Sequence, residues 1–232
     1  MKKLQTLRCT LVGIVSLLAT GASAEESPAA APGKNQVEPA QAAVAMEDPR
    51  AGDYWTYEIK DEISGSLTAT RTDTITEVTP SQIGVSYSNR EKGTTGFSVY
   101  DHDWNTKNAD AMKYTPHSGL GIVSPLKVGA LWNFKVEQVN TEKGLAWKWS
   151  GQSKVSGQEQ ITTKIGVFDT FKIETKYTFY PVGNPGRKGE NTVQTWYAPS
   201  VDHWVRRTIT SRIDNLLRSS QNIELVAYGR KQ

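Results

Sequence analysis

The chain has 232 residues, with 27 Lys and Arg, 24 Asp and Glu, and one cysteine. Three of the basic residues and none of the acids fall in the first 24 residues, so positions 25–232 carry 24 basic and 24 acidic side chains. This neutral balance excludes the strongly basic face that a nucleic-acid partner requires. The lone Cys9 excludes a disulfide within the chain.

The first 24 residues have the three parts of a secretory signal peptide. Lys2, Lys3 and Arg8 precede an apolar run at 11–18, and small alanines stand at 22 and 24. The run is too short to span a bilayer, which takes about 20 apolar residues. We therefore expect a cleaved leader and a periplasmic protein that does not span the membrane. Cys9 precedes the apolar run, so it leaves with the leader and is not a lipid-attachment site.

Residues 25–49 contain seven alanines, four prolines and no aromatic residue. Such a composition cannot bury apolar surface, so we predict a disordered segment. It is interpreted as a plain mature N-terminus, with an envelope-crossing spacer as the alternative. Residues 50–232 are predicted to form a single β domain.

Almost every segment after Arg50 is rich in β-branched and aromatic residues that alternate with period two. In Thr170–Tyr180, the apolar and polar side chains fall on opposite faces. At most one helical turn is expected, near Asn108–Lys113, and Val167–Asp169 is interpreted as a reversal. The other predicted strands are 53–61, 66–79, 82–90, 95–101, 130–139, 144–156, 159–165, 192–198, 202–213 and 219–228.

A short motif occurs twice, 77 residues apart. Gly52-x-x-Trp55-x-aromatic-x-aliphatic matches the segment that begins at Gly129 and Trp132. This favours two meanders of four to six strands joined by an irregular stretch at 101–128; the alternative is two hairpins with a similar first strand. About ten antiparallel strands must curl or close to cover their edges. The predicted fold class is therefore all-β, a strongly curved antiparallel sheet or half-barrel.

We expect the glycine of the second copy to form a tight turn that lays the indole of Trp132 across the start of the second half. Trp132→Ala is then expected to cost about 3–5 kcal/mol, as other core aromatic deletions do. Trp204→Ala is expected to cost about 1 kcal/mol or less if that ring faces a ligand or solvent.

Four short motifs occur in the order found in exported bacterial TapB-like proteins: PLKVGxxW at 125–132, GxFDTFKI at 166–173, TWYAP at 195–199 and ELVxY at 224–228. The chain resembles this family over about 125–228 and more weakly over 50–60. The resemblance implies a curved antiparallel half-barrel like that of envelope lipoprotein carriers, and it supplies no catalytic residues. The segment 200–204, SVDHW, departs from the family's glycine-containing turn.

Catalytic and metal motifs are absent or incomplete. No G-x-S-x-G motif is present. Ser124-x-x-Lys127 and Ser220-x-Asn222 match two motifs of serine β-lactamases, but the first precedes a strand and no K-T-G follows. In the cluster DHDWNTKNAD at 101–110, an EF-hand would need glycine at Thr106 and glutamate at Met112. A looser calcium site and a polar turn both remain open. His102, His117 and His203 show no zinc-ligand spacing. We predict no catalytic residue, no metal and no cofactor.

Tryptophan is the enriched residue type, with seven in the chain. These rings either fill a wide sheet interior or form a platform for a ligand. The candidate ligand-binding residues are Trp147, Trp149, Trp196, Trp204 and Arg206.

The leading hypothesis from the sequence is a non-catalytic envelope protein. Its concave sheet would bind a lipid, another apolar ligand or a partner-protein segment. The alternative is a glycan- or peptidoglycan-binding module with outward-facing tryptophans. A hydrolase that uses scattered carboxylates is a third possibility.

Overall fold

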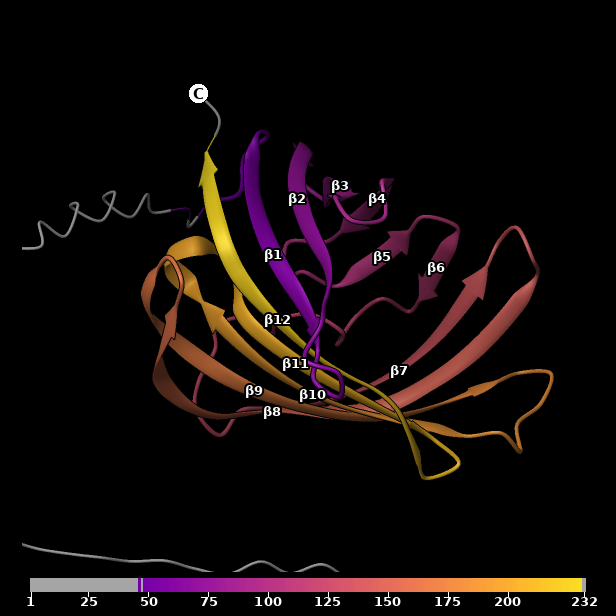
Figure 1. Ribbon diagram of the computed structural model, residues 1–232. Helices are drawn as coiled ribbons and strands as arrows, with labels where there is room; N and C mark the ends of the chain where they lie inside the picture. Colours follow the sequence, from indigo (N-terminus) through magenta and orange to yellow (C-terminus); the bar gives the residue numbers. More distant parts are fainter. Residues whose placement is uncertain (1–45, 47, 231–232) are drawn as a thin grey trace, which may run out of the picture. The chain divides into compact units, whose positions relative to one another are not determined.

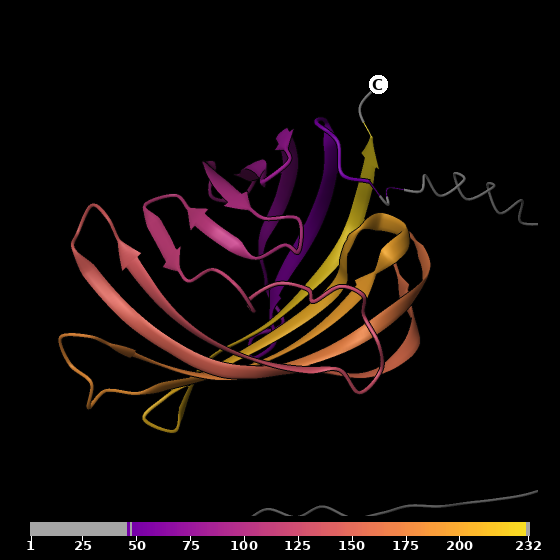
Figure 2. The same ribbon diagram turned by 180° about the vertical axis from the view of Figure 1, so that it is seen from behind.

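The computed structural model describes Met46 and residues 48–230, so the predicted signal peptide and most of the predicted disordered segment lie outside the described residues. These residues form an all-antiparallel β-barrel whose strands pair in chain order (Figures 1 and 2). The strands are β1 Asp53–Asp61, β2 Leu67–Thr79, β3 Gln82–Asn89, β4 Thr94–Tyr100, β5 Thr106–Ala109, β6 Met112–Thr115, β7 Leu131–Asn140, β8 Leu145–Thr163, β9 Gly166–Pro181, β10 Gly189–Ala198, β11 His203–Ile213 and β12 Leu216–Arg230, with the 3-10 turn η1 at Pro199–Val201. Among the described residues, no helix is long and apolar enough to cross a membrane.

The barrel has twelve strands and is closed, which corrects the predicted half-barrel of about ten strands. The last strand returns to the first, and Asp53–Asp61 of β1 pairs with Arg230–Gln221 of β12. A forked ion pair joins the two strands: Arg230 Nε and Nη2 lie 2.7 and 3.0 Å from the two carboxylate oxygens of Asp53, which is fully buried. Closure removes the two free edges that an open sheet would expose.

The predicted helical turn near Asn108–Lys113 is wrong, because these residues form the hairpin between β5 and β6. Asp110 adopts a left-handed conformation, φ 50°, and makes the tight reversal. Its carboxylate accepts hydrogen bonds from the Tyr87 hydroxyl at 2.5 Å and the Phe97 amide at 2.9 Å, which tie the hairpin to β3 and β4. Strands of four residues are too short to show a period of two in the sequence.

The separately predicted strands 144–156 and 159–165 form one continuous strand, β8. The break between the two predicted strands coincides with a register shift between Val155 and Gly157. Glycine inside a strand often marks such a bulge. The chain reverses just before Gly166, where β9 begins, and not at the predicted Val167–Asp169.

The repeated glycine motif marks equivalent positions in the barrel. Gly52 and Gly129 both have left-handed backbones, with φ 94° and 88°, and each precedes the first strand of a six-strand half. A side chain would strain this conformation, so the predicted tight turn at Gly129 is confirmed. The tryptophans that follow differ: Trp55 is fully buried, whereas Trp132 is half-buried and donates to the Gly119 carbonyl at 3.1 Å.

The fully buried side chains gather at one end of the barrel, here called the core end. It carries the β2–β3, β4–β5, β6–β7, β8–β9 and β10–β11 connections. Gly121 packs on the backbone of the β4–β5 loop so closely that a Cβ would lie 2.1 Å from the Asp103 carbonyl oxygen. Met46 is also buried, and its amide donates to Ser200 O at 2.9 Å, so the packed structure includes a residue before Arg50. The core end is thus filled by Trp55, Ile75, Ile83, Trp104, Ile122, Val155, Ile161, Phe168, Val201 and Val205.

Candidate ligand-binding cavity

A cavity of about 350 Å³ lies inside the barrel between the core end and the opposite end. This volume falls in the range of about 300–1,000 Å³ that is typical of small-molecule sites. Most of the lining is aliphatic or aromatic. Five aliphatic members come from the neighbouring strands β9 to β12 and β1: Ile59, Ile173, Val193, Ile209 and Ile223. Each of these five lies on the inward face of a strand that alternates polar and apolar residues. The other two, Leu120 and Ile122, lie in the β6–β7 connection.

Aromatic rings form one wall of the cavity. The indole of Trp149 stacks on Tyr177 with ring centroids 5.1 Å apart, and the edge of Tyr114 meets Trp149 at 5.9 Å. Gly151 pairs with Tyr177 and leaves it room, since a Cβ there would lie 2.4 Å from the Tyr177 Cβ. The buried Trp149 Nε1 has no hydrogen-bond partner among the described residues.

A single arginine enters the cavity from β11. The Arg207 guanidinium lies 3.7 Å from the ring centroid of Trp204, and its Nε donates to Thr195 Oγ1 at 3.1 Å. Burial lowers the pKa of Arg207 to about 10, against the smaller raising effect of nearby tyrosines. The side chain therefore remains a cation at neutral pH.

A second arginine in the lining is already paired. Arg71 Nε lies 2.7 Å from Asp73 Oδ1, and the guanidinium lies 4.1 Å from the ring centroid of Tyr87. Burial raises the pKa of Asp73, while Arg71 opposes this shift. The charged residues of the lining are thus Arg71, Asp73 and Arg207, which leaves one excess positive charge.

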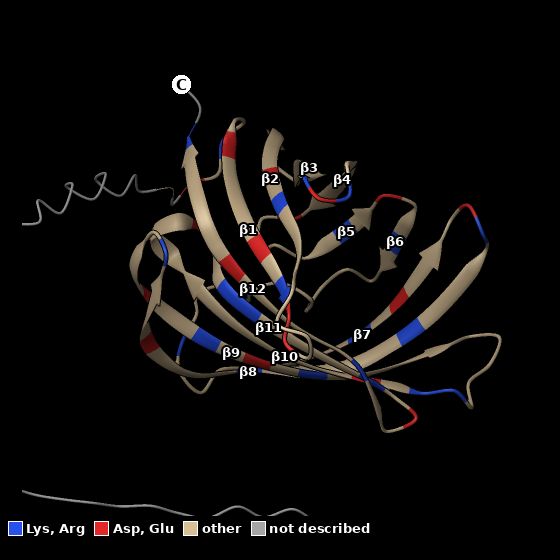
Figure 3. Cartoon of the chain, in the orientation of Figure 1, with Lys and Arg blue, Asp and Glu red and all other residues tan. Residues whose placement is uncertain are grey.

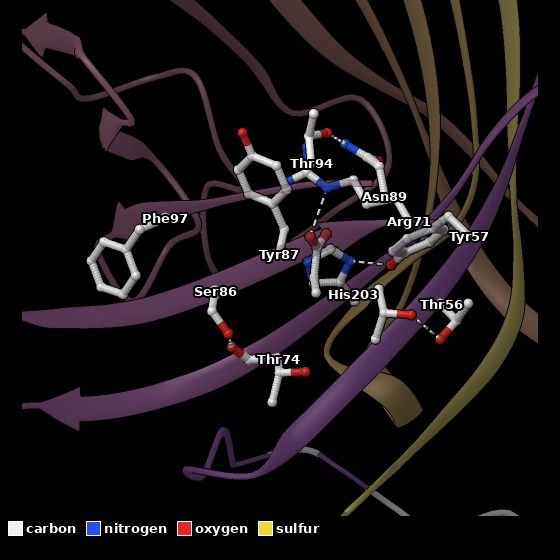
Figure 4. A network of polar contacts seen from close by, with 12 residues as sticks. Thr56, Tyr57, Arg71, Thr74, Ser86, Tyr87, Asn89, Thr94, Phe97 and His203 are labelled. Carbon is white, nitrogen blue, oxygen red and sulfur yellow. Dashed lines mark hydrogen bonds and ion pairs between the residues drawn. The ribbon is translucent and has the colours of Figure 1, made fainter. Parts of the chain in front are cut away.

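Tyr57 lines the cavity and contacts His203, which is not itself part of the lining. Figure 4 shows this buried Tyr–His contact. The Tyr57 hydroxyl lies 2.5 Å from His203 Nδ1 and 3.1 Å from the Trp204 carbonyl oxygen. Burial lowers the pKa of His203 well below its usual value, with Arg207 and Arg71 acting in the same direction. His203 is therefore neutral at physiological pH, and it stacks on Trp55 at 4.6 Å.

The structure brings two of the five candidate residues into the cavity lining, Trp149 and Trp204. Trp147 is half-buried farther along β8 and does not line the cavity. Trp196 and Arg206 face the outside of the barrel, where Trp196 donates to Glu159 at 2.5 Å and Arg206 pairs with Glu224 at 3.0 Å. Figure 3 shows basic residues on β11 and an acidic residue on the neighbouring β12.

The main polar residues of the cavity were not predicted. Arg207, Tyr57 and Tyr177 are absent from the candidates, although Tyr177 belongs to the alternating apolar face of Thr170–Tyr180. That alternation is the signal that could have identified it as an inward residue.

In the cluster at 101–110, residues 101–105 form a polar turn, and Thr106–Ala109 are strand β5. Asp101 Oδ1 accepts the backbone amides of Asp103 and Asn105 at 3.0 and 2.8 Å. Among residues 46 and 48–230, no group of three metal-binding side chains lies together. The three histidines are dispersed: His203 contacts the Tyr57 hydroxyl, His102 contacts the Thr79 carbonyl, and His117 lies 3.9 Å from Asp101.

These features define the protein as a closed antiparallel barrel with an internal, mainly apolar cavity. Its fold is similar to that of a candidate lipoprotein from Parabacteroides distasonis, with a TM-score of 0.54 and 15% identity over 82% of this chain and 100% of the other. It is also similar to a candidate exported protein with a YmcC-like fold from Bacteroides fragilis, with a TM-score of 0.52 and 13% identity over 78% and 97% of the two chains. At these identities the likeness shows the fold alone.

The sequence comparisons add nothing further. No family model matches the chain, and no curated protein matches it.

Proposed function

We propose that this protein is an exported, non-catalytic envelope protein that binds an apolar ligand inside its barrel. The cavity carries the proposal, because an interior lined by aliphatic and aromatic side chains favours an apolar guest through the removal of apolar surface from water. The structural neighbours described as exported protein and lipoprotein support an envelope location. The proposal includes the relationship to TapB-like proteins that the sequence motifs indicate.

The glycan-binding alternative depends on tryptophans that face solvent. All seven tryptophans belong to the described residues, and every one is buried or half-buried. Trp149 and Trp204 face the interior cavity, and Trp196 is packed under Lys172, whose Nζ lies 5.3 Å from the ring centroid. The arrangement therefore favours an interior ligand over a surface sugar platform.

A variant that fills the cavity tests this proposal. The uncharged fluorescent probe N-phenyl-1-naphthylamine brightens in apolar surroundings, so we expect saturable brightening with the wild-type protein at one probe per chain. Val193→Trp should reduce probe affinity at least about 10-fold, because the larger side chain occupies the cavity. Gln194→Trp, one residue along β10 and on its outer face, should bind like the wild type.

Far-ultraviolet circular dichroism would verify that both variants keep the barrel. Equal probe binding by folded Val193→Trp and wild type would place the probe outside the cavity and contradict the proposal. A wild-type protein that shows no saturable brightening would contradict it as well.

A further inference from the structure

Arg207 lacks both a counter-charge and acceptors for its terminal nitrogens among the described residues. Arg207 uses its Nε–H on Thr195, and one face of its guanidinium lies against Trp204. Among the described residues, no carboxylate oxygen lies within 4 Å of it, and its terminal nitrogens donate no hydrogen bond to the protein. A cation held among buried groups without a counter-charge is costly, so a bound anion would relieve that cost.

Two other polar groups of the cavity wall, on Tyr177 and Trp149, have a free donor. Tyr177 accepts a hydrogen bond from Asn191 Nδ2 at 2.6 Å, which leaves its own O–H without an acceptor among the described residues. Trp149 Nε1–H has no acceptor either. The carboxylate of the lining, Asp73, is taken by Arg71. A guest that supplies negatively charged oxygen atoms therefore matches what the cavity lacks.

The residues around Arg207 determine the orientation of a ligand that binds to it. Val205, two residues toward the core end, is fully buried and blocks that side. Ile209, two residues toward the opposite end, lines the cavity beside its pairing partner Val193. Ile223 of β12 pairs with Arg207 itself and continues the apolar surface. An anionic group at Arg207 would thus place an attached apolar chain along Ile209 and Val193.

We infer that the ligand is an amphiphile with one anionic oxygen group, a carboxylate or a phosphate monoester, that Arg207 binds inside the barrel. This inference rests on the proposed function and specifies the chemical class of its ligand. The anionic group enters first and the aliphatic chain points away from the core end. The Arg71–Asp73 pair stays intact, because its charges already balance.

The test compares three probes that share one chain: dodecanoate, dodecyl phosphate and the uncharged dodecanol. Each displaces N-phenyl-1-naphthylamine from the full mature protein below its aggregation concentration. We expect at least one of the two anions to displace the fluorescent probe at a concentration 10-fold or more below that of dodecanol, as a charge-assisted hydrogen bond would give. The stronger of the two anions then identifies the group as carboxylate or phosphate.

Arg207→Gln should remove this preference and leave the affinity for dodecanol within about 2-fold, whereas Arg207→Lys should keep part of it. Arg206→Gln is the matched control, since the neighbouring arginine faces outward and pairs with Glu224; it should bind all three probes like the wild type. Retention of the preference by folded Arg207→Gln would overturn the assignment to Arg207.

The wild-type protein alone also decides the matter if Arg207→Gln does not fold. Equal displacement by dodecanol and both anions would overturn the anionic class while leaving the apolar cavity in place. Absence of fluorescent-probe binding, in contrast, would be a failure of the proposed function.

Discussion

Replacing Trp55 with alanine is expected to destabilise the barrel by about 3–5 kcal/mol. The indole is fully buried, stacks on His203 at 4.6 Å and meets Trp104 edge-on at 5.6 Å. Its Nε1 donates to Val201 O at 2.9 Å, so the substitution also leaves a buried carbonyl without its partner. Because a domain is usually stable by only about 5–15 kcal/mol, the midpoint of urea unfolding should fall steeply.

The matched control is Trp132→Ala, at the equivalent position of the repeated motif. Its ring is half-buried, so we now expect a loss below that of Trp55→Ala and below the about 3–5 kcal/mol predicted from the sequence. Equal losses of unfolding free energy for the two variants in urea melts would mean that Trp55 and Trp132 stabilise the barrel equally. That result would contradict the difference in their burial.

We expect the protonated carboxyl of Asp202 to stabilise the folded protein, and this stabilisation to be lost as pH rises. Burial raises the pKa of its carboxyl to about 6, although hydrogen bonds from Tyr197 at 2.5 Å and Trp104 at 3.3 Å act in the opposite direction. The folded state therefore holds the proton more tightly than the unfolded state. The resulting stabilisation is complete below about pH 4 and disappears as pH rises through 6, with an upper limit of about 3 kcal/mol.

Asp202→Asn should remove this pH dependence. The amide keeps an oxygen acceptor, and asparagine tolerates the left-handed backbone of this position, φ 47°. The unfolding free energy of the variant relative to wild type should rise between pH 4 and pH 7. Buried neutral His203 has the opposite effect, because its protonation destabilises the folded protein as pH falls. Both proteins contain His203, so its contribution cancels in the difference between their unfolding free energies.

Asp214→Asn is the control for this experiment, because Asp214 is exposed in a turn with a similar left-handed backbone, φ 51°. Its unfolding free energy should follow the wild-type pH curve. A constant difference between Asp202→Asn and wild type across pH 4–7 would show that the Asp202 carboxyl titrates alike in the folded and unfolded states.

Local alternation predicted most of the strands because each long strand has one buried and one exposed face. β1 begins and ends where the pattern predicts, at Asp53 and Asp61. Closure could not be predicted in the same way, since the pairing of β1 with β12 joins residues more than 150 positions apart. Nothing in the local period of two distinguishes a closed barrel from a curved sheet.

One β-bulge in β11 explains why the alternation of residues predicted the wrong arginine for the site. Trp204 and Arg206 have the same parity, which groups them on one face in a regular strand. A register shift between Trp196 and Tyr197 pairs Tyr197 with Trp204 and Trp196 with Arg206, so β11 carries an extra residue, Val205. Trp204 faces the cavity and Val205 the core, and the next inward residue is Arg207 in place of Arg206.

The central claim, that the barrel interior receives an apolar molecule, is tested most directly by quenching of intrinsic tryptophan fluorescence with a bromine-bearing dodecanol. Bromine quenches only at short range, and Trp149 and Trp204 line the cavity. We predict saturable quenching at one molecule per chain, with unbrominated dodecanol producing none and competing for the same site. Quenching that rises linearly with concentration, or none at all, would contradict an internal binding site.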